Sequence, residues 1–297
     1  MIVENSLDLP RPFVSAAESD YQYKPKRYSV TAVMKGPREA ILQRRHDDEI
    51  TCDASEMIWA IFGTAVHSVL EQAEETESQL KENKIVVEMP NGYELSGIFD
   101  LYDDSTGTVT DYKTASCWKV KFGEFDDWRK QVLCYCWMLR KLGFDAKRGE
   151  IVALLKDHSK TKAKIGEHPP TPVYRIGWDF TDGDFEEIGD WLEERFEEIE
   201  RCEQLPDDEL PVCAPEERWH RPGKYAVMKK GRKKAIRLYD DEVDAYDRAY
   251  MEGDGYYVEH RPGSDPKCED YCSAAPFCSY YKEMYGEGAD AKGGIDG

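Results

Sequence analysis

The stretch that most constrains the fold is ELSGIFDLYDDSTGTVTDYKT, residues 94–114, which has the pattern of two strands joined by a tight turn. Two runs rich in β-branched and aromatic residues flank the turn-forming sequence DDSTG. Such a hairpin places two carboxylates and an ammonium group close together at strand ends, namely Asp100, Asp111 and Lys113. These three side chains are the first candidates for a functional site.

The charges of this cluster indicate the chemistry that it can perform. Two carboxylates a few ångströms apart repel each other unless a cation lies between them, and oxygen ligands of this kind suit Mg²⁺ or Mn²⁺. A nearby ammonium group can orient a water molecule or offset charge on a phosphate. The cluster favours metal-assisted hydrolysis of a phosphodiester, although charged residues are also common on the exposed ends of ordinary hairpins.

The overall charge limits how the chain can bind nucleic acid. With 60 acidic and 40 basic residues, the 297-residue chain has a formal net charge of −20, whereas surfaces that bind nucleic acid are usually basic. Two basic islands stand out, residues 156–164 (KDHSKTKAK) and residues 229–237 (KKGRKKAIR). Binding to phosphates is expected to use such local patches, and a solvated surface is the alternative interpretation of each.

The sequence also indicates a compartment. No apolar run is long enough to cross a membrane, and the start of the chain, MIVENSLDLPRPFVS, lacks the basic residues and apolar core of a signal peptide. We therefore expect an intracellular, cytoplasmic protein with no membrane association. The length allows one large domain or a domain with an elaboration.

Two long helices are predicted on either side of the hairpin. Residues 57–83 carry apolar residues at helical spacing, which predicts a buried stripe made of Ile58, Ile61, Phe62, Ala65, Val66, Val69 and Leu70. Gly63 and His67 lie one turn apart on this helix, and His67 is either a core histidine or a nitrogen ligand beside the carboxylates. The second helix, residues 124–142, places Gln131 and Tyr135 on one face.

The other periodic segments predict a mixed α/β protein. Buried strands are expected over residues 150–155 and 173–180, and a long acidic helix follows from Thr181 to about Cys202. A short helix over residues 32–45 is expected to be kinked or interrupted at Pro37. Strands and helices in this order favour an α/β core with helices packed on a sheet.

The two ends of the chain differ from its middle in their sequence pattern. Residues 1–27 are expected to wrap loosely or to be disordered, and the tail, residues 286–297, to be disordered. Between residue 205 and the tail we expect a hairpin that turns near Gly231, a short helix over residues 241–251 and a final aromatic helix.

The nine cysteines are an odd number, so they cannot all pair as disulfides, and in a chain without a secretory signal metal binding is the favoured use. Cys268, Cys272 and Cys278 have ligand-like spacing. Cys213 is the best candidate for a fourth ligand, and Cys52 is the alternative. Either a [4Fe-4S] cluster or Zn²⁺ suits such thiolates. The remaining cysteines follow helix patterns and are expected to pack as small apolar residues: Cys117, Cys134, Cys136 and Cys202.

Taken together, these motifs resemble the PD-(D/E)xK nuclease superfamily, specifically its RecB-like and phage exonuclease branch, which includes the CRISPR-associated RecB-type exonucleases. That family has a helix with G-x-x-x-H, a strand with G-x-x-D, a strand with D/E-x-K and a helix with Q-x-x-x-Y. This chain has GTAVH at residues 63–67, GIFD at 97–100, DYK at 111–113 and QVLCY at 131–135, in that order. The similarity covers roughly residues 28–160 and 205–285.

The resemblance implies a restriction-endonuclease-like α/β fold, with a central mixed sheet flanked by helices over residues 28–204 and a metal-stapled extension over residues 205–285. It implies the metal ligands His67, Asp100, Asp111 and the backbone carbonyl of Tyr112. Lys113 would position or activate the attacking water, and Gln131 and Tyr135 would assist. Several iron–sulfur members close their nuclease domain with a C-terminal cysteine cluster and often carry an N-terminal cysteine before Pro-Arg. This sequence has Gly36 there, which leaves the fourth position to Cys213.

The expected function is therefore that of a divalent-metal-dependent DNA exonuclease in phage DNA processing, recombination or repair. Single-stranded DNA or DNA ends are the expected partner, and recombination or replication proteins are further partners that this role implies. Two alternatives remain: a catalytically inactive DNA-binding or recruiting protein that keeps the fold, and a structural zinc protein with an incidental acidic hairpin. The intact set of acids and lysine argues against the inactive protein.

Overall fold

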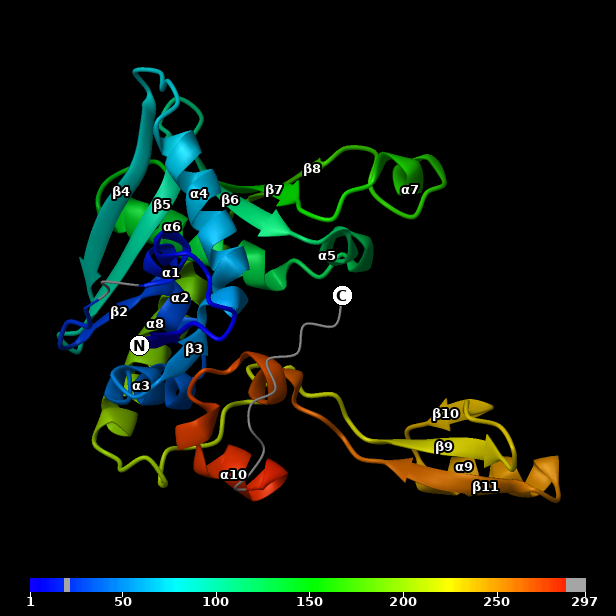
Figure 1. The fold of residues 1–297 in the computed structure, drawn as a ribbon. Helices are drawn as coiled ribbons and strands as arrows, with labels where there is room; N and C mark the ends of the chain where they lie inside the picture. Colours follow the sequence, from blue (N-terminus) through cyan, green and yellow to red (C-terminus); the bar gives the residue numbers. More distant parts are fainter. Residues whose placement is uncertain (19–21, 287–297) are drawn as a thin grey trace. The chain divides into compact units, whose positions relative to one another are not determined.

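The computed structural model describes residues 1–18 and 22–286 and divides the chain into two compact units, Met1–Leu210 and Pro211–Gly297 (Figure 1). The strands of the first unit are β1 (Ile2–Glu4), β2 (Arg27–Ser29), β3 (Thr51–Asp53), β4 (Gln79–Glu88), β5 (Glu94–Asp103), β6 (Thr108–Ala115), β7 (Arg148–Leu155) and β8 (Val173–Asp179). Its α-helices are α1 (Arg11–Ala17), α2 (Val30–Val33), α3 (Pro37–Arg45), α4 (Ile58–Glu71), α5 (Cys117–Phe122), α6 (Asp126–Lys141), α7 (Lys160–Lys164) and α8 (Asp182–Glu203), and η1 (Ala54–Met57) is a 3₁₀ turn.

The first unit is built on a six-stranded mixed sheet. Its order is β2-β5-β6-β7-β8, and β4 pairs with β5. The β5–β6 hairpin forms as predicted, and α6 is the crossover helix that joins the parallel strands β6 and β7. Helices α6 and α8 pack on one another beside the sheet. This arrangement confirms the predicted α/β class with a central mixed sheet flanked by helices.

Strand β5 changes its partner along one edge, and this leaves a gap in the sheet. Along one edge it pairs with β4 from Glu94 to Asp103, with an interruption at Asp100. The other edge is shared, because β2 pairs with residues 94–96 and β6 with residues 101–103. The segment between them, Gly97–Asp100, has neither neighbour in its ladder on that edge. The G-x-x-D motif therefore lies where the sheet opens.

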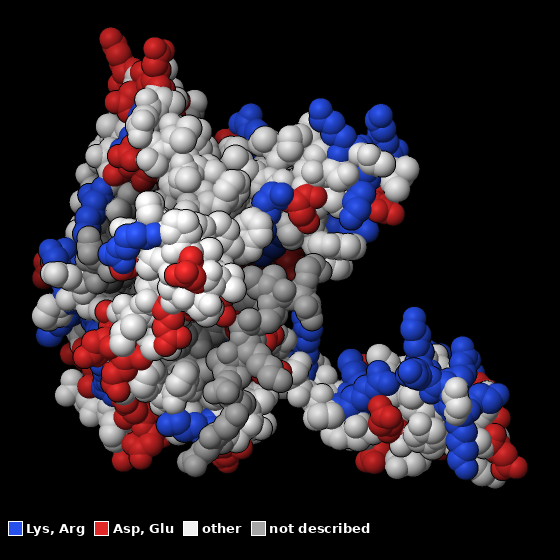
Figure 2. Space-filling model, in the orientation of Figure 1, with Lys and Arg blue, Asp and Glu red and all other residues white. Residues whose placement is uncertain are grey.

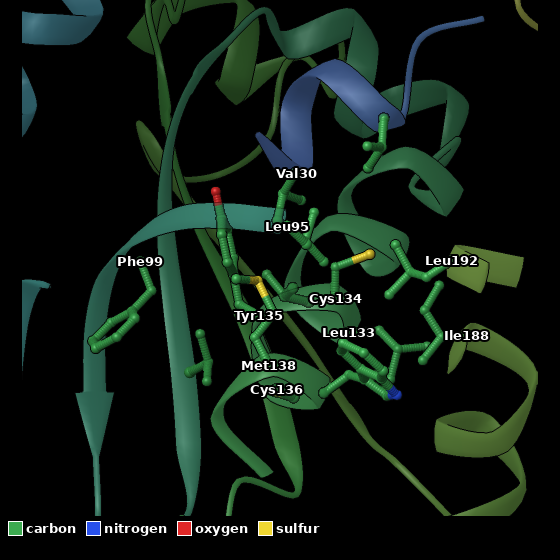
Figure 3. Close-up of a cluster of buried hydrophobic side chains, with 14 of the residues drawn as sticks. Val30, Leu95, Phe99, Leu133, Cys134, Tyr135, Cys136, Met138, Ile188 and Leu192 are labelled. Atoms are coloured by element: carbon green, nitrogen blue, oxygen red, sulfur yellow. The ribbon is translucent and has the colours of Figure 1, made fainter. Parts of the chain in front are cut away.

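Helix α6 fills the space beside this opening. Tyr135, which is 4 % exposed, packs among Val30, Leu95 and Met138, and Leu133 faces Ile188 and Leu192 of α8 (Figure 3). A Cβ atom added to Gly97 would lie 2.6 Å from Cε1 of Tyr135 and 3.3 Å from Cγ2 of Val30. Only glycine at residue 97 allows the Tyr135 ring this close to β5.

The helix predicted over residues 57–83 is wrong in its second half. Helix α4 ends at Glu71, and residues 79–88 form β4, whose antiparallel ladder with β5 supplies hydrogen bonds that residues in a helix would not make. The predicted buried stripe is also wrong, because no residue of α4 is buried. Periodicity identified the helix but could not show whether another element covers its apolar side.

The N-terminal segment, expected to be loose or disordered, instead has structure within residues 1–18. Strand β1 pairs in parallel with β3, and α1 buries Val14 and Ala17 against Ala54. The predicted interruption at Pro37 is confirmed: Pro37 is the first residue of α3, where its missing N–H costs nothing. The long acidic helix is also confirmed, and Thr181 with Asp184 forms a capping box at its start.

The second unit contains a small three-stranded sheet and a helix. Strands β9 (Lys224–Lys229), β10 (Arg237–Tyr239) and β11 (Tyr256–Arg261) pair in the order β10-β9-β11, and α9 (Glu242–Glu252) packs on them through Ala245 and Ala249. The predicted hairpin and helix are present, whereas β11 was not predicted. Short turns η2 (Lys267–Tyr271) and η3 (Ala275–Phe277) precede the aromatic helix α10 (Ser279–Tyr285). Beyond Gly286 the predicted tail lies outside the described residues. No helix in the described ranges has the length and apolarity to cross a membrane.

The close contact at residue 97 generates a first prediction. Gly97→Ala should destabilise the first unit by about 1–3 kcal/mol, because the added methyl group forces the Tyr135 ring to move within a packed core. Urea unfolding followed by tryptophan fluorescence measures the loss. Gly63→Ala is the matched control, since its Cβ would lie 3.8 Å from Oγ1 of Thr114, an ordinary contact. That helical substitution should be neutral or stabilise by about 0.5–1 kcal/mol. Equal stabilities for the two variants would contradict the proposed contact.

Candidate active site

Three side chains from three different elements converge beside the opening in the sheet. Nδ1 of His67 on α4 lies 3.1 Å from Oδ1 of Asp100 on β5 and 3.5 Å from Oε1 of Glu82 on β4. One ligand atom from each residue lies within 4.8 Å of the other two, as a metal site requires. The structure therefore brings together His67 and Asp100, which the sequence predicted, and adds Glu82.

Glu82 occupies the position on β4 that faces Asp100. The ladder pairs Lys81 with Leu101 and Asn83 with Phe99, so Glu82 and Asp100 are the residues between these pairs. Glu82 has a φ of 49°, in the left-handed region that a residue with a side chain rarely adopts. Strained backbone of this kind persists only where surrounding structure enforces it, and it is concentrated at functional sites.

The sequence interpretation missed Glu82 because it placed this residue near the end of a helix. The available signal was the run Ile85–Val87, three β-branched residues that favour a strand over a helix. Had residues 79–88 been assigned to a strand before the G-x-x-D strand, an acid on it would have been a candidate. The pairing of Glu82 with Asp100 itself is a long-range property that local patterns do not contain.

The D-x-K pair lies next to this group. Asp111 follows Thr110, the last residue of β6 paired with β5, and it is 3 % exposed. Nζ of Lys113 lies 2.7 Å from Oδ2 of Asp111, but this buried oxygen has no hydrogen bond among the described residues. The Nε2 group of Gln131 donates to Oδ1 of Asp111 at 3.3 Å and contacts the Tyr135 hydroxyl at 3.4 Å. Lys113, Gln131 and Tyr135 are therefore connected to Asp111 in one cluster.

Tyr112 is held by the site through its backbone. Its N–H donates to Oδ2 of Asp100 at 2.6 Å, which ties the middle of β6 to the G-x-x-D strand. Its ring meets the His67 imidazole edge-on, with 6.4 Å between ring centroids. The structure thus places Tyr112 at the site, while the predicted role of its carbonyl oxygen stays a prediction.

The electrostatics show an excess of negative charge. The hydrogen bond from His67 to Asp100 raises the pKa of His67 to about 9, although partial burial opposes this effect. Burial and the charge of Asp100 raise the pKa of Glu82. Burial also raises the pKa of Asp111; Lys113 opposes this rise, and the charge of Asp100 adds to it. Burial is the largest cause of the rise for the two carboxylates, and the neighbouring negative charge of Asp100 adds to it.

These residues fit a hard divalent cation. Carboxylate oxygens with one imidazole nitrogen form a donor set that suits Mg²⁺ or Mn²⁺. The buried carboxylate of Asp111, paired with Lys113 through Oδ2, is a further oxygen donor beside this group. The donor atoms of the site therefore suit Mg²⁺ or Mn²⁺, the metals that the sequence predicted.

The cysteines fall into two groups. Cys117, Cys134, Cys136 and Cys202 are buried, which confirms their predicted packing role, and Cys213, Cys268, Cys272 and Cys278 are half-buried residues of the second unit. Cys52 belongs to the first unit, where its thiol donates to Glu56 and to the Asp53 carbonyl at 3.6 Å. None of the nine cysteines, all of which lie within the described ranges, forms a disulfide.

The fold and the site together define a class of protein: an α/β protein in which acids, a histidine and a lysine gather where a mixed, restriction-endonuclease-like sheet opens. The comparison with known families gives the same class. The model of the PD-(D/E)XK nuclease superfamily matches residues 76–279, more than half of the chain. The chain belongs to the PD-(D/E)XK nuclease superfamily, whose members are nucleases that typically use Mg²⁺ or Mn²⁺.

Two solved structures are similar to this chain at low identity. A crystal structure of SSO0001 is 17 % identical with a TM-score of 0.46, and the alignment covers 62 % of this chain and 83 % of that one. A phage-related exonuclease from Haemophilus somnus 129PT is 10 % identical with a TM-score of 0.28, with 58 % and 82 % covered. Both scores are too low to inform the function. No curated protein matches the chain.

The position of Glu82 generates a second prediction. Glu82→Gln should weaken Mn²⁺ binding at least about 10-fold, because it removes one charged oxygen from the convergent group. Isothermal titration of the protein with Mn²⁺ alone measures this effect without any substrate. Glu77→Gln is the matched control, since Glu77 is exposed in the turn before β4 and the substitution removes the same charge. If both variants bind Mn²⁺ as the unsubstituted protein does, Glu82 is not a ligand.

Proposed function

We propose that this chain is a divalent-metal-dependent deoxyribonuclease of the exonuclease type. The observation that carries the proposal is the convergence of His67, Glu82 and Asp100 beside the buried Asp111–Lys113 pair. Burial raises the pKa of Glu82 and of Asp111 even though His67 and Lys113 lie beside them. Partly buried acids with shifted pKa values are concentrated at functional sites.

The residues have separate roles in this proposal. His67, Glu82, Asp100 and Asp111 hold the cation, and the carbonyl of Tyr112 completes the predicted set. When bound, such a cation supplies Lewis acidity at the phosphate and makes water a stronger nucleophile. Lys113 orients the attacking water and offsets charge on the phosphate, because its Nζ is held 2.7 Å from Oδ2 of Asp111 and its side chain is 24 % exposed.

Gln131 and Tyr135 act by positioning Asp111. The amide of Gln131 hydrogen-bonds both the Asp111 carboxylate and the Tyr135 hydroxyl, and the Tyr135 ring is fixed by its packing on Gly97. Because Oδ1 is tied to α6 through Gln131, and Oδ2 is paired with Lys113, the Asp111 carboxylate is held in one orientation in which it would serve as a ligand. This second layer of contacts is typical of metal sites in which ligand orientation matters.

DNA is the proposed substrate, and the second unit offers a surface for it. The loop between β9 and β10 and its flanks carry six exposed cations, seen as the blue patch on this unit in Figure 2: Lys229, Lys230, Arg232, Lys233, Lys234 and Arg237. Within the described part of the chain, none of the six has a carboxylate partner. A cluster of unbalanced cations on a chain of net charge −20 supports binding of a polyanion.

The third prediction tests the catalytic pair. Lys113→Ala and Asp111→Asn should each lower the rate of DNA cleavage by about 100- to 1000-fold or more, because each removes a charge at the reacting phosphate or its cation. Cleavage of end-labelled linear DNA in Mg²⁺ or Mn²⁺ provides the measurement. Asp126→Asn is the control, because Asp126 is an exposed acid in the first turn of α6.

The substrate set decides the type of nuclease. An exonuclease degrades linear single- or double-stranded DNA and leaves closed circular DNA intact, as expected for an enzyme that processes ends in recombination, repair or phage replication. Cleavage of circles would show endonuclease action. Identical cleavage by Lys113→Ala and the unsubstituted protein would contradict the site assignment.

We further propose that the second unit holds a [4Fe-4S] cluster, with Zn²⁺ as the alternative, through Cys213, Cys268, Cys272 and Cys278. Arg218 supports the choice of Cys213. Its Nε donates to the Cys213 carbonyl at 2.9 Å. Arg218 also pairs with the 2 %-exposed Asp265, which ties the loop of Cys213 to the segment that carries Cys268.

The fourth prediction separates the two candidates for the fourth ligand. Cys213→Ser should lose most of the bound iron and its visible absorbance after anaerobic purification, whereas Cys52→Ser should keep both. Metal analysis with absorbance spectra gives the result. A colourless protein that carries one zinc ion would favour the zinc site, and loss of iron in Cys52→Ser alone would reverse the assignment.

A further inference from the structure

Exposed aromatic side chains lie on α4 and on α5, and Lys156 links the two helices, because its Nζ lies over Trp59 and its N–H donates to the Ala115 carbonyl just before α5. Trp59 and Phe62 of α4 are 44 % and 38 % exposed, and Trp118 and Phe122 of α5 are 53 % and 69 % exposed. The rings form two pairs: Trp59 meets Phe62 edge-on at 6.3 Å, and Trp118 stacks on Phe122 at 5.8 Å. We call these four residues the aromatic shelf. Large aromatic rings gathered in contact with water mark a binding surface.

The shelf adjoins the candidate active site. Trp59, Gly63 and His67 are four residues apart in turn, so they lie along one side of α4, and Trp59 is about 12 Å from His67 along the helix axis. Gly63 lies close to Thr114, the residue after Lys113. Helix α5 begins two residues after β6 ends. The shelf therefore flanks the end of β6 that carries the D-x-K pair, as the neighbouring positions of α4, β6 and α5 in Figure 1 show.

Lysines accompany the rings. Nζ of Lys156 lies 3.6 Å from the centroid of Trp59, and Nζ of Lys121 lies 4.7 Å from that of Trp118. Both lysines are exposed, and neither has a carboxylate partner in the described ranges. Asp157 accepts a hydrogen bond from the Cys117 N–H at 2.7 Å, which fixes the start of α5 beside the Lys156 loop. The surface combines fixed aromatic faces with unbalanced positive charge.

We propose that the aromatic shelf binds single-stranded DNA and guides it to the site at His67 and Asp111. Bases stack on Trp59 and Trp118, while Lys121 and Lys156 contact the phosphates of the same strand. A duplex hides the faces of its bases, so the shelf selects an unpaired strand or a frayed end. The inference rests on the proposed nuclease function and adds the strand type of the substrate.

The positive charge at the shelf favours single-stranded DNA over a protein partner. The centres of protein–protein interfaces are depleted of charged residues, especially lysine. Here Lys156 lies over the ring of Trp59 and Lys121 over the ring of Trp118. Grooves that track single strands have this combination of cations and aromatic faces.

The test measures binding without hydrolysis. In an Asp111→Asn background and metal-free buffer, fluorescence anisotropy follows a labelled single strand of about 20 nucleotides and the corresponding duplex. Trp59→Ala and Trp118→Ala should each weaken single-strand binding about 10-fold and change duplex binding less than about 2-fold. Trp59→Phe, which keeps a ring, should retain most of the affinity. Tyr250→Ala, at a ring 89 % exposed on α9, is the matched control and should bind as the background does.

The other outcomes count either against the shelf or against the catalytic function. Unchanged single-strand binding in both alanine variants, or an equal loss on the duplex, would overturn the proposal. Dissociation of an oligomer on Trp59→Ala, seen by analytical ultracentrifugation with DNA binding intact, would assign the shelf to a second copy of the chain. If the shelf variants lose single-strand binding but the unsubstituted protein cleaves no DNA, the proposed catalytic function fails while the shelf proposal stands.

Discussion

Electrostatic repulsion among acids is the constraint on which the rest of the structure depends. Glu82 and Asp100 face each other across β4 and β5, and Asp111 begins the part of β6 that leaves β5. Nothing in the chemistry of three carboxylates holds them together, so the backbone must do so. The β4–β5 ladder continues on both sides of Glu82, and the Tyr112 N–H bonds Asp100. The sheet thus holds the acids close together against their electrostatic repulsion, which a bound cation would offset.

The opening in the sheet explains why these acids can be reached. A strand paired on both edges along its whole length would bury its backbone and leave no room at its centre. In β5 the second edge passes from β2 to β6, and Gly97–Asp100 lies in the interval. Tyr135 closes the interior side of this interval by packing on the bare Cα of Gly97. Gln131, one turn earlier on the same helix, then reaches Asp111. Gly97, Tyr135 and Gln131 therefore act together to hold Asp111 in place.

Local sequence was enough to predict what local structure decides. Asp100, Asp111 and Lys113 lie in one hairpin, and Gln131 and Tyr135 share one face of one helix, so their grouping followed from short-range rules. Glu82 required knowledge of which strand pairs with β5, which no local pattern contains. The exposure of α4 also escaped prediction, because apolar periodicity is the same whether a helix faces a core or a ligand. Both failures lie at the site, where functional demands override packing.

The exposed rings of α4 and α5 offer this acidic chain a way to bind a polyanion. A protein of net charge −20 repels DNA at long range, and affinity based on lysine contacts alone falls steeply with salt. Stacking of bases on aromatic faces releases no counterions, so its contribution is nearly independent of salt. In the proposed mode of binding, a strand stacked on Trp59 and Trp118 beside His67 would need few charge contacts near Asp100 and Asp111. The contribution of the shelf to affinity should then depend less on salt than lysine contacts alone would.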